Sequence, residues 1–103
     1  MKLVKKPKAC ENIGEIRDAI DNIDLEIIRL FALRHEYVKE IVKFKSSNEG
    51  IIARERQDIV LKQRTVWAKE SGVDPGMMEE VFRILIDKNI QLQLDIYKKK
   101  DKS

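Results

Sequence analysis

The chain has 103 residues, of which 38% are charged and 6% aromatic, with 4 glycines and 2 prolines. This composition favours a single all-helical domain, and no apolar run approaches the ~20 residues that a membrane span needs. The one cysteine, Cys10, excludes an intrachain disulfide, and one histidine, His35, argues against a Cys/His zinc site. We therefore expect neither a metal nor a cofactor.

The net charge of +3 comes from the two ends of the chain. Residues 1–12 are predicted to form a basic N-terminal tail and residues 98–103 a basic C-terminal tail, with one helical domain at 13–97. Without residues 1–8 and 98–103, 13 basic and 17 acidic residues remain, so the body is acidic and does not suit nucleic acid. The basic start lacks the apolar stretch of a signal peptide, and a cytoplasmic protein is expected.

A first helix is predicted from Ile13 to about Phe44, with Asn12 as its N-cap. At 100° per residue one face is continuously apolar, and at 1.5 Å per residue the helix is about 45–50 Å long. The apolar face carries Ile13, Ile16, Ile20, Ile23, Ile27, Leu30, Phe31, Val38 and Ile41. Two shorter helices cannot cover so long a face, so an intertwined dimer is expected. A plain coiled coil fits less well, because breaks interrupt the pattern.

The polar stretch SSNEG, residues 46–50, predicts a loop after this helix. A second helix is predicted to start near Ala53, and one of its faces holds Arg56, Ile59, Val60, Gln63, Val66 and Trp67. Gly72 suits its C-cap. Asp74 and Pro75 suit the start of a third helix that runs to about Tyr97.

Polar side chains interrupt the apolar face of each predicted helix. Arg34 and Lys45 lie three turns apart in the first face, Arg56 lies in the second, and Asn89 and Gln93 lie four residues apart in the third. Burying a cation costs several kcal/mol unless it is paired. Internal pairing or snorkelling would explain any single case. For five such groups we favour a ligand, and three cations with two amides suit a small dianion.

Arg17 lies 17 residues before Arg34, about 25 Å along the helix axis. It cannot reach the same ligand within one straight helix, but it could do so from a second chain packed antiparallel. Pairing with Asp21 on the surface explains Arg17 equally well.

The stretch IGEIRDAIDNIDLEIIRLFALRHEYVKEIVKFK, residues 13–45, resembles the first helix of the all-helical chorismate mutase family. The likeness continues through ARERQ, GVDPGMMEEVFRILI and NIQLQ, and reaches about Ile96. Within this family, DAIDNIDLEII, YVKEIVKFK and WAKESGVD resemble most closely the isochorismate pyruvate lyase branch, which forms salicylate for siderophore synthesis.

The resemblance implies an intertwined homodimer with two composite sites and a small dicarboxylate substrate. Arg34 and the Arg17 of the other chain would hold the two carboxylates. Lys45 and Gln93 would contact the ether oxygen, and Arg56 would complete the pocket. The main activity would be that of an isochorismate pyruvate lyase, with weaker chorismate mutase activity. The alternatives are a chorismate mutase of aromatic amino-acid synthesis and a non-enzymatic helical interaction module.

Two positions depart from the pattern of the mutases. These commonly have Glu after the arginine matched to Arg56, where this chain has Gln57, and the loss favours the lyase. Asn89 stands where a typical mutase has Ser, so its role as a substrate-binding residue stays open. No Ser-His-Asp set or carboxylate pair is evident, which suits a pericyclic reaction that needs no enzyme nucleophile. Residues 46–50 could form a mobile lid or an ordinary connector.

Overall fold

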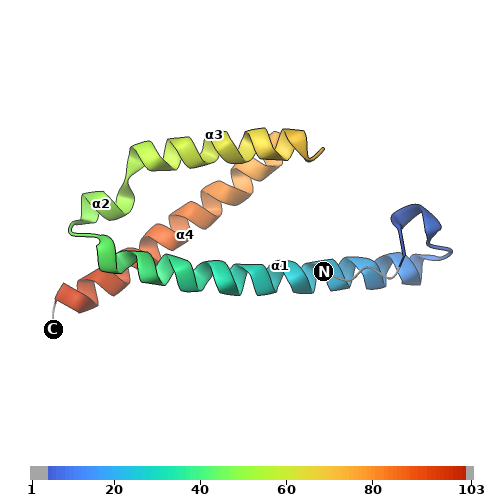
Figure 1. Ribbon diagram of the computed structural model, residues 1–103, viewed down its shortest axis with the longest axis horizontal. Helices are drawn as coiled ribbons and strands as arrows, with labels where there is room; N and C mark the ends of the chain where they lie inside the picture. The colour runs from blue at the N-terminus through green and yellow to red at the C-terminus, as the bar shows by residue number, and fades with distance from the viewer. Residues whose placement is uncertain (1–4, 102–103) are drawn as a thin grey trace. The chain divides into compact units, whose positions relative to one another are not determined.

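The computed structural model describes residues 5–101 and is all-helical over that range, as predicted (Figure 1). Three long helices correspond to the three predicted ones. The elements are η1 (Pro7–Ala9), α1 (Ile13–Ile41), η2 (Val42–Phe44), α2 (Asn48–Ile52), α3 (Arg54–Glu70) and α4 (Pro75–Asp101). The chain divides within α1 into two compact units, the first ending at Tyr37 and the second beginning at Val38. Across residues 5–101, no helix has the length and apolar character required for crossing a membrane.

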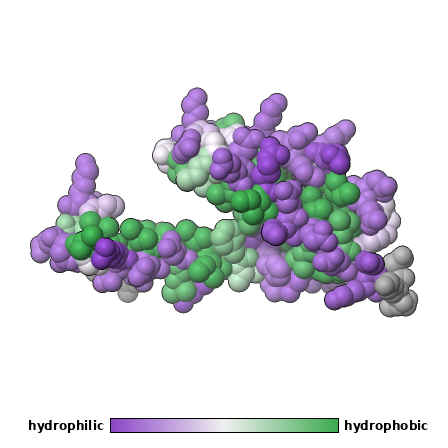
Figure 2. Space-filling model, turned by 180° about the vertical axis from the view of Figure 1, so that it is seen from behind, coloured by the Kyte–Doolittle hydropathy of each residue, from purple (hydrophilic) through white to green (hydrophobic). Residues whose placement is uncertain are grey.

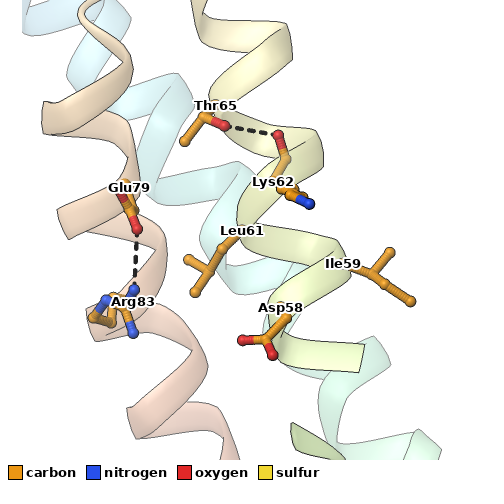
Figure 3. A pocket seen from close by; sticks show the side chains of 7 residues that line it. All are labelled: Asp58, Ile59, Leu61, Lys62, Thr65, Glu79 and Arg83. Atoms are coloured by element: carbon orange, nitrogen blue, oxygen red, sulfur yellow. Dashed lines mark hydrogen bonds and ion pairs between the residues drawn. The ribbon is translucent and has the colours of Figure 1, made fainter. Parts of the chain in front are cut away.

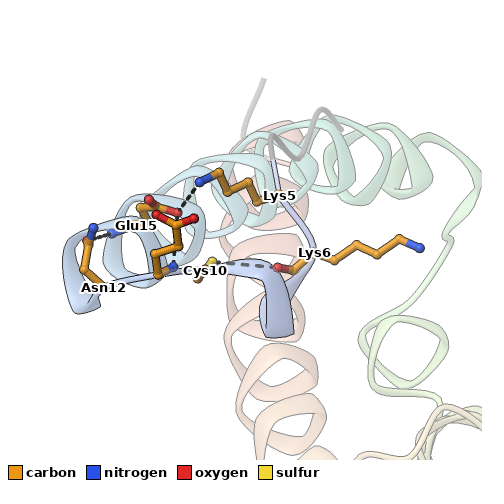
Figure 4. Close-up of polar contacts among 6 residues, drawn as sticks. Lys5, Lys6, Cys10, Asn12 and Glu15 are labelled. Atoms are coloured by element: carbon orange, nitrogen blue, oxygen red, sulfur yellow. Dashed lines mark hydrogen bonds and ion pairs between the residues drawn. The ribbon is translucent and has the colours of Figure 1, made fainter.

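The first unit begins α1 with the predicted cap (Figure 4). The Asn12 Oδ1 atom accepts a hydrogen bond of 2.9 Å from the backbone N–H of Glu15, which satisfies one of the free donors of the first turn. The Lys5 ammonium lies 2.8 Å from the Glu15 carboxylate. This contact lowers the pKa of Glu15 below its ordinary value. The N-cap assigned to Asn12 is therefore confirmed.

The apolar face of α1 has no partner helix in its own unit, since residues 5–37 contain only η1 besides this helix. Ile13 and Leu30 are 62% and 63% exposed, and Figure 2 shows apolar side chains at the surface along α1. A stripe of this kind requires cover from elsewhere to become a core.

The second unit opens with the end of α1, which tightens into the 3₁₀ turn η2 around the buried Val42. Helical backbone therefore reaches Phe44, as predicted. Lys45 lies beyond it in extended conformation, with φ −102° and ψ 136°. Placing Lys45 on the helical wheel with Arg34 was therefore wrong, because the helix ends one residue before it.

Three of the five residues of the predicted loop, 48–50, are helical and belong to α2. Ser47 caps α2, and its Oγ accepts a 3.0 Å hydrogen bond from the N–H of Gly50. A Cβ at Gly50 would lie 3.2 Å from that Oγ, so glycine permits the close approach. Ala53 ends α2 in the left-handed region with φ 42°, which redirects the chain into α3. Polar composition predicted a loop here, whereas the Ser47 cap and the buried Ile51 support a helical turn.

The turn between α3 and α4 follows the prediction. Gly72 has φ 74°, a left-handed value that suits glycine after a helix. Asp74 accepts a 3.3 Å hydrogen bond from the N–H of Gly76, and Pro75 is the first residue of α4. The helix ends at Asp101 rather than near Tyr97, and so includes Lys98–Lys100 of the predicted basic tail.

The core face of α3 differs from the predicted one. Leu61 and Ala68 are buried, being 7% and 5% exposed, and α3 packs against α4. Ile59 and Val66, on the predicted face with Arg56, are 57% and 53% exposed. Apolar residues occur on two sides of this helix, and the choice between them depends on where α4 lies.

Candidate functional site

Two of the predicted site residues, Arg17 and Arg34, belong to the first unit. Both lie on α1, Arg17 exposed and Arg34 half-buried. Burial lowers the pKa of the Arg34 guanidinium, because losing water disfavours its charged form. An arginine stays protonated at neutral pH even so. Arg34 is therefore a partly dehydrated cation, which an anion would stabilise.

Lys45 belongs to the second unit and is half-buried. Its backbone N–H donates a 3.1 Å hydrogen bond to the carbonyl of Val42, which closes the 3₁₀ turn. Because Val42 is only 2% exposed, the backbone that precedes Lys45 is anchored in the core of this unit.

On α4, Asn89, Gln93 and Tyr97 follow one another at four-residue intervals and share one side of the helix. Asn89 and Gln93 are half-buried. The Asn89 Nδ2 atom is buried and donates no hydrogen bond within residues 5–101. A buried donor without a partner costs about 1–3 kcal/mol, so an arriving acceptor would stabilise it.

The Tyr97 hydroxyl donates a 2.8 Å hydrogen bond to the backbone carbonyl of Ser46. Ser46 directly follows Lys45, and Tyr97 lies one turn of helix beyond Gln93. This bond therefore brings the chain at Lys45 to the side of α4 that carries Gln93. Sequence reasoning missed Tyr97, although its position four residues after Gln93 was a usable signal.

Arg56 lies in the first turn of α3 and is exposed. It lines a cavity of about 690 Å³ formed by α2, Ala53 and the start of α3, together with Glu49, Gly50, Ile52, Arg54 and Glu55. The next residue, Gln57, uses its side-chain amide to donate a 2.6 Å hydrogen bond to the carbonyl of Ile52. Sequence reasoning identified Gln57 as a departure from the mutases but did not foresee this role.

The positive charges of the predicted site remain uncompensated in the part of the chain that the structure describes. Within residues 5–101, no carboxylate forms an ion pair with Arg17, Arg34, Lys45 or Arg56. Other cations do find such partners, for example Arg29 with Glu26 at 2.7 Å. The alternative interpretation of Arg17, a surface pair with Asp21, has no such contact here.

A second cavity, of about 550 Å³, lies between α3 and α4 (Figure 3). Its charged lining residues are Asp58, Lys62, Glu79 and Arg83, and the last two form an ion pair at 3.0 Å. Two acids and two bases leave this cavity without net charge. It therefore suits a dianion less well than the predicted basic residues do.

The structure thus groups the predicted residues only in part. The Tyr97 bond joins Ser46, the residue after Lys45, to the side of α4 that carries Gln93, and Arg56 follows the same connecting segment in the second unit. Arg17 and Arg34 lie in the first unit. The assignment of all six residues to one site remains a prediction.

Comparison with known proteins shows the family to which the chain belongs. The profile of the chorismate mutase type II family matches residues 16–94. The chain belongs to the chorismate mutase type II family. It is 37% identical to the isochorismate pyruvate lyase of Pseudomonas aeruginosa over 95 residues, covering 92% of this chain and 94% of that protein. It is also 33% identical to the chorismate mutase of Methanocaldococcus jannaschii over 84 residues, covering 81% and 85% of the two chains.

A longer relative shares the same region. The T-protein of Haemophilus influenzae is 35% identical over 74 residues, which are 71% of this chain but 20% of that protein. Chorismate mutase type II relatives thus include both short chains and much longer ones. Membership of this family supports an enzyme.

Proposed function

We propose that this member of the family is an isochorismate pyruvate lyase, which converts isochorismate into salicylate and pyruvate and has weaker chorismate mutase activity. The alternative is a chorismate mutase whose main product is prephenate. Both substrates are dianions that carry an enolpyruvyl ether on a six-membered ring. The two reactions therefore require the same cationic pocket and differ in which bond forms as the ether breaks.

The observation that carries the proposal is the set of cations without acidic partners. Arg34, Lys45 and Arg56 occupy the family's site positions, and within residues 5–101 none pairs with a carboxylate. Two carboxylates of one substrate would compensate these charges. Arginine forks bind carboxylates in two-point contacts, which fix orientation as well as affinity.

The chemistry requires no enzyme nucleophile. In the lyase reaction a ring hydrogen passes to the enolpyruvyl methylene as the ether bond breaks, and negative charge grows on the ether oxygen. Holding the flexible arm over the ring supplies orientation that is worth several kcal/mol. Lys45 and Gln93 donate to the ether oxygen, and they stabilise its charge more in the transition state than in the ground state.

Gln57 is the residue that favours the lyase. In the mutases that the chain resembles, a glutamate at this position contacts the ring hydroxyl of chorismate. Here the side-chain amide of Gln57 is hydrogen-bonded to Ile52 instead, at 2.6 Å. Isochorismate carries its hydroxyl elsewhere on the ring and does not need that contact.

The active form in this proposal is a homodimer whose sites combine Arg34 of one chain with Arg17 of the other. Support comes from the first unit, where the apolar face of α1 has no partner helix and Ile20 and Leu30 are 50% and 63% exposed. Antiparallel pairing of two such helices would cover both faces. It would also bring Arg17 of each chain toward Arg34 of the other, which lies about 25 Å away within one chain.

A comparison of two substrates tests the proposal. Purified protein is mixed with isochorismate while salicylate fluorescence is followed, and separately with chorismate while prephenate is measured. The lyase predicts a higher kcat/KM for isochorismate. A higher value for chorismate would establish the mutase. Activity on neither substrate would favour the remaining alternative, a non-enzymatic helical interaction module.

A further inference from the structure

The segment that joins Lys45 to α3, residues 46–53, is held at several points. Ile51 within the segment is 4% exposed, and Val42 just before it is 2% exposed. The elements η2 and α2, on either side of Lys45, both pack against α4. The segment therefore has the burial of a structured connector, which bears on its alternative interpretation as a mobile lid.

Three side chains also bond to the backbone of this segment. Ser47 accepts from the N–H of Gly50 at 3.0 Å, and Gln57 donates to the carbonyl of Ile52 at 2.6 Å. These two bonds join residues three and five positions apart, and so hold only local shape. The bond of 2.8 Å from the Tyr97 hydroxyl to the Ser46 carbonyl spans 51 positions and ties the segment to α4.

The long-range bond lies at the solvent-exposed surface. Tyr97 also lines an open pocket of about 480 Å³, together with Asn48, Gln91, Leu94, Asp95 and Lys98. Since side chains leave this volume open, the hydroxyl of Tyr97 is a specific link between the start of the segment and α4. Replacing the hydroxyl by hydrogen would remove the link while keeping the ring.

Backbone hydrogen bonds hold the chain on both sides of Lys45. On one side of Lys45, its N–H is bonded to Val42 at 3.1 Å; on the other, the carbonyl of the next residue is bonded to Tyr97. Tyr97 itself lies about 6 Å along α4 from Gln93, one turn away. The backbone of Lys45 is thus fixed relative to the turn that presents Gln93.

We propose that Tyr97 is a positioning residue, whose hydroxyl holds Lys45 in register with Gln93 by binding the carbonyl of Ser46. This inference rests on the proposed function, in which Lys45 and Gln93 act on the same ether oxygen. Tyr97 does not touch the reacting atoms. It raises the fraction of molecules in which the Lys45 ammonium lies where negative charge develops.

The first test is kinetic and uses Tyr97→Phe. A hydrogen bond of this kind contributes about 0.5–1.5 kcal/mol net, so its loss should lower kcat about 2- to 10-fold while KM changes less. Tyr37→Phe is the matched control, because it removes a hydroxyl from a side chain that is 71% exposed in the first unit. The control should leave kcat unchanged.

A double-mutant cycle separates positioning from general stability. In a Lys45→Met background there is no ammonium left to position, so adding Tyr97→Phe should lower kcat no further. If Tyr97 only stabilises the fold, its substitution should lower kcat by the same factor with or without Lys45. Additive effects would therefore overturn the proposal.

Limited digestion with trypsin tests the link without any catalysis. Cleavage after Lys45 releases fragments 1–45 and 46–103, which mass spectrometry distinguishes. Tyr97→Phe should accelerate this cleavage about 2- to 10-fold, whereas cleavage after Arg29, in the middle of α1, should keep its rate. Unchanged cleavage after Lys45 would overturn the proposal, and so would faster cleavage with an unaltered kcat. If the unmodified protein acts on neither substrate, the proposed function fails, and the digestion alone decides whether Tyr97 restrains the segment.

Discussion

Gln57→Glu is the most informative single substitution, because it changes one hydrogen-bond donor into an acceptor. The amide of Gln57 donates to the Ile52 carbonyl at 2.6 Å in a partly buried contact. An ionised carboxylate has no proton to donate and repels the carbonyl oxygen. The substituted side chain must therefore turn away and leave that carbonyl without this partner.

Two opposing effects set the magnitude. Leaving a partly buried carbonyl without its donor costs about 1–3 kcal/mol. A negative charge near the first turn of α3 contributes about 0.3–1 kcal/mol in the opposite direction, through the helix dipole. The lost hydrogen bond is the larger effect, and the net destabilisation should be about 1–2 kcal/mol at pH 7.

Urea unfolding followed by circular dichroism measures this difference. Gln63→Glu on the same helix is the matched control, since the Gln63 side-chain oxygen accepts from Arg64 and a carboxylate accepts equally well. The control should lose little or no stability. The variants should also be compared for their ratio of prephenate to salicylate formation, which Gln57→Glu should raise.

The pH dependence of the stability lost by Gln57→Glu offers a way to refute this reasoning. When protonated, the introduced carboxyl can again donate to Ile52, which raises its pKa in the folded protein above the ordinary value of about 4.3. The folded state then binds a proton more tightly than the unfolded state does. The loss of stability is therefore full at neutral pH and shrinks as the pH falls through the raised pKa. A deficit that is absent at pH 7, or that grows on acidification relative to the Gln63→Glu control, would contradict the reasoning.

The remaining predictions concern a cation, an ion pair and a strained backbone. Lys45→Met should lower kcat about 10²- to 10³-fold with little change in KM, because it removes a donor from the developing oxyanion. Steady-state kinetics measure this with Lys43→Met as the control, and near-normal turnover by Lys45→Met would contradict it. Lys5→Ala should raise the pKa of Glu15 toward its ordinary value, since the Lys5 hydrogen bond is the main cause of the lowered value; an NMR titration that finds no movement refutes it. Ala53→Gly should stabilise the protein by about 0.5–1 kcal/mol, because relief of the left-handed φ of 42° outweighs the added chain entropy of glycine; a lower urea midpoint would oppose that.

Local signals in the sequence predicted the ends of the helices well. Asn12 and Asp74 act as the N-caps that their residue types indicate, and Gly72 takes a left-handed φ directly after Ser71, the C-cap residue of α3. A cap depends on neighbours within four residues, which a sequence shows directly. There are two exceptions. The Ser47 cap of α2 was hidden in a polar stretch that also contains Gly50, and α4 ends at Asp101 rather than near Tyr97.

Features that depend on distant residues were predicted less well. The core face of α3 was misassigned, because Leu61 and Ala68 are buried only by virtue of where α4 packs. The bond between Tyr97 and Ser46 spans 51 positions, and no periodicity within one helix reveals it. The helical wheel assigned Lys45 the wrong backbone conformation, because the helix ends at Phe44. Its role in the site, which the family resemblance implies, stays a prediction.

Each proposed site is built from cations of two chains, and a mixing experiment tests this arrangement most directly. Arg17→Ala and Arg34→Ala should each abolish most activity on isochorismate. When the two variants are unfolded together and refolded as a mixture, half of the dimers are mixed, and each mixed dimer regains one intact site. Recovery of about a quarter of the unmodified rate is expected, because half of the dimers then have one of their two sites intact. A mixture no more active than the two variants alone would contradict it.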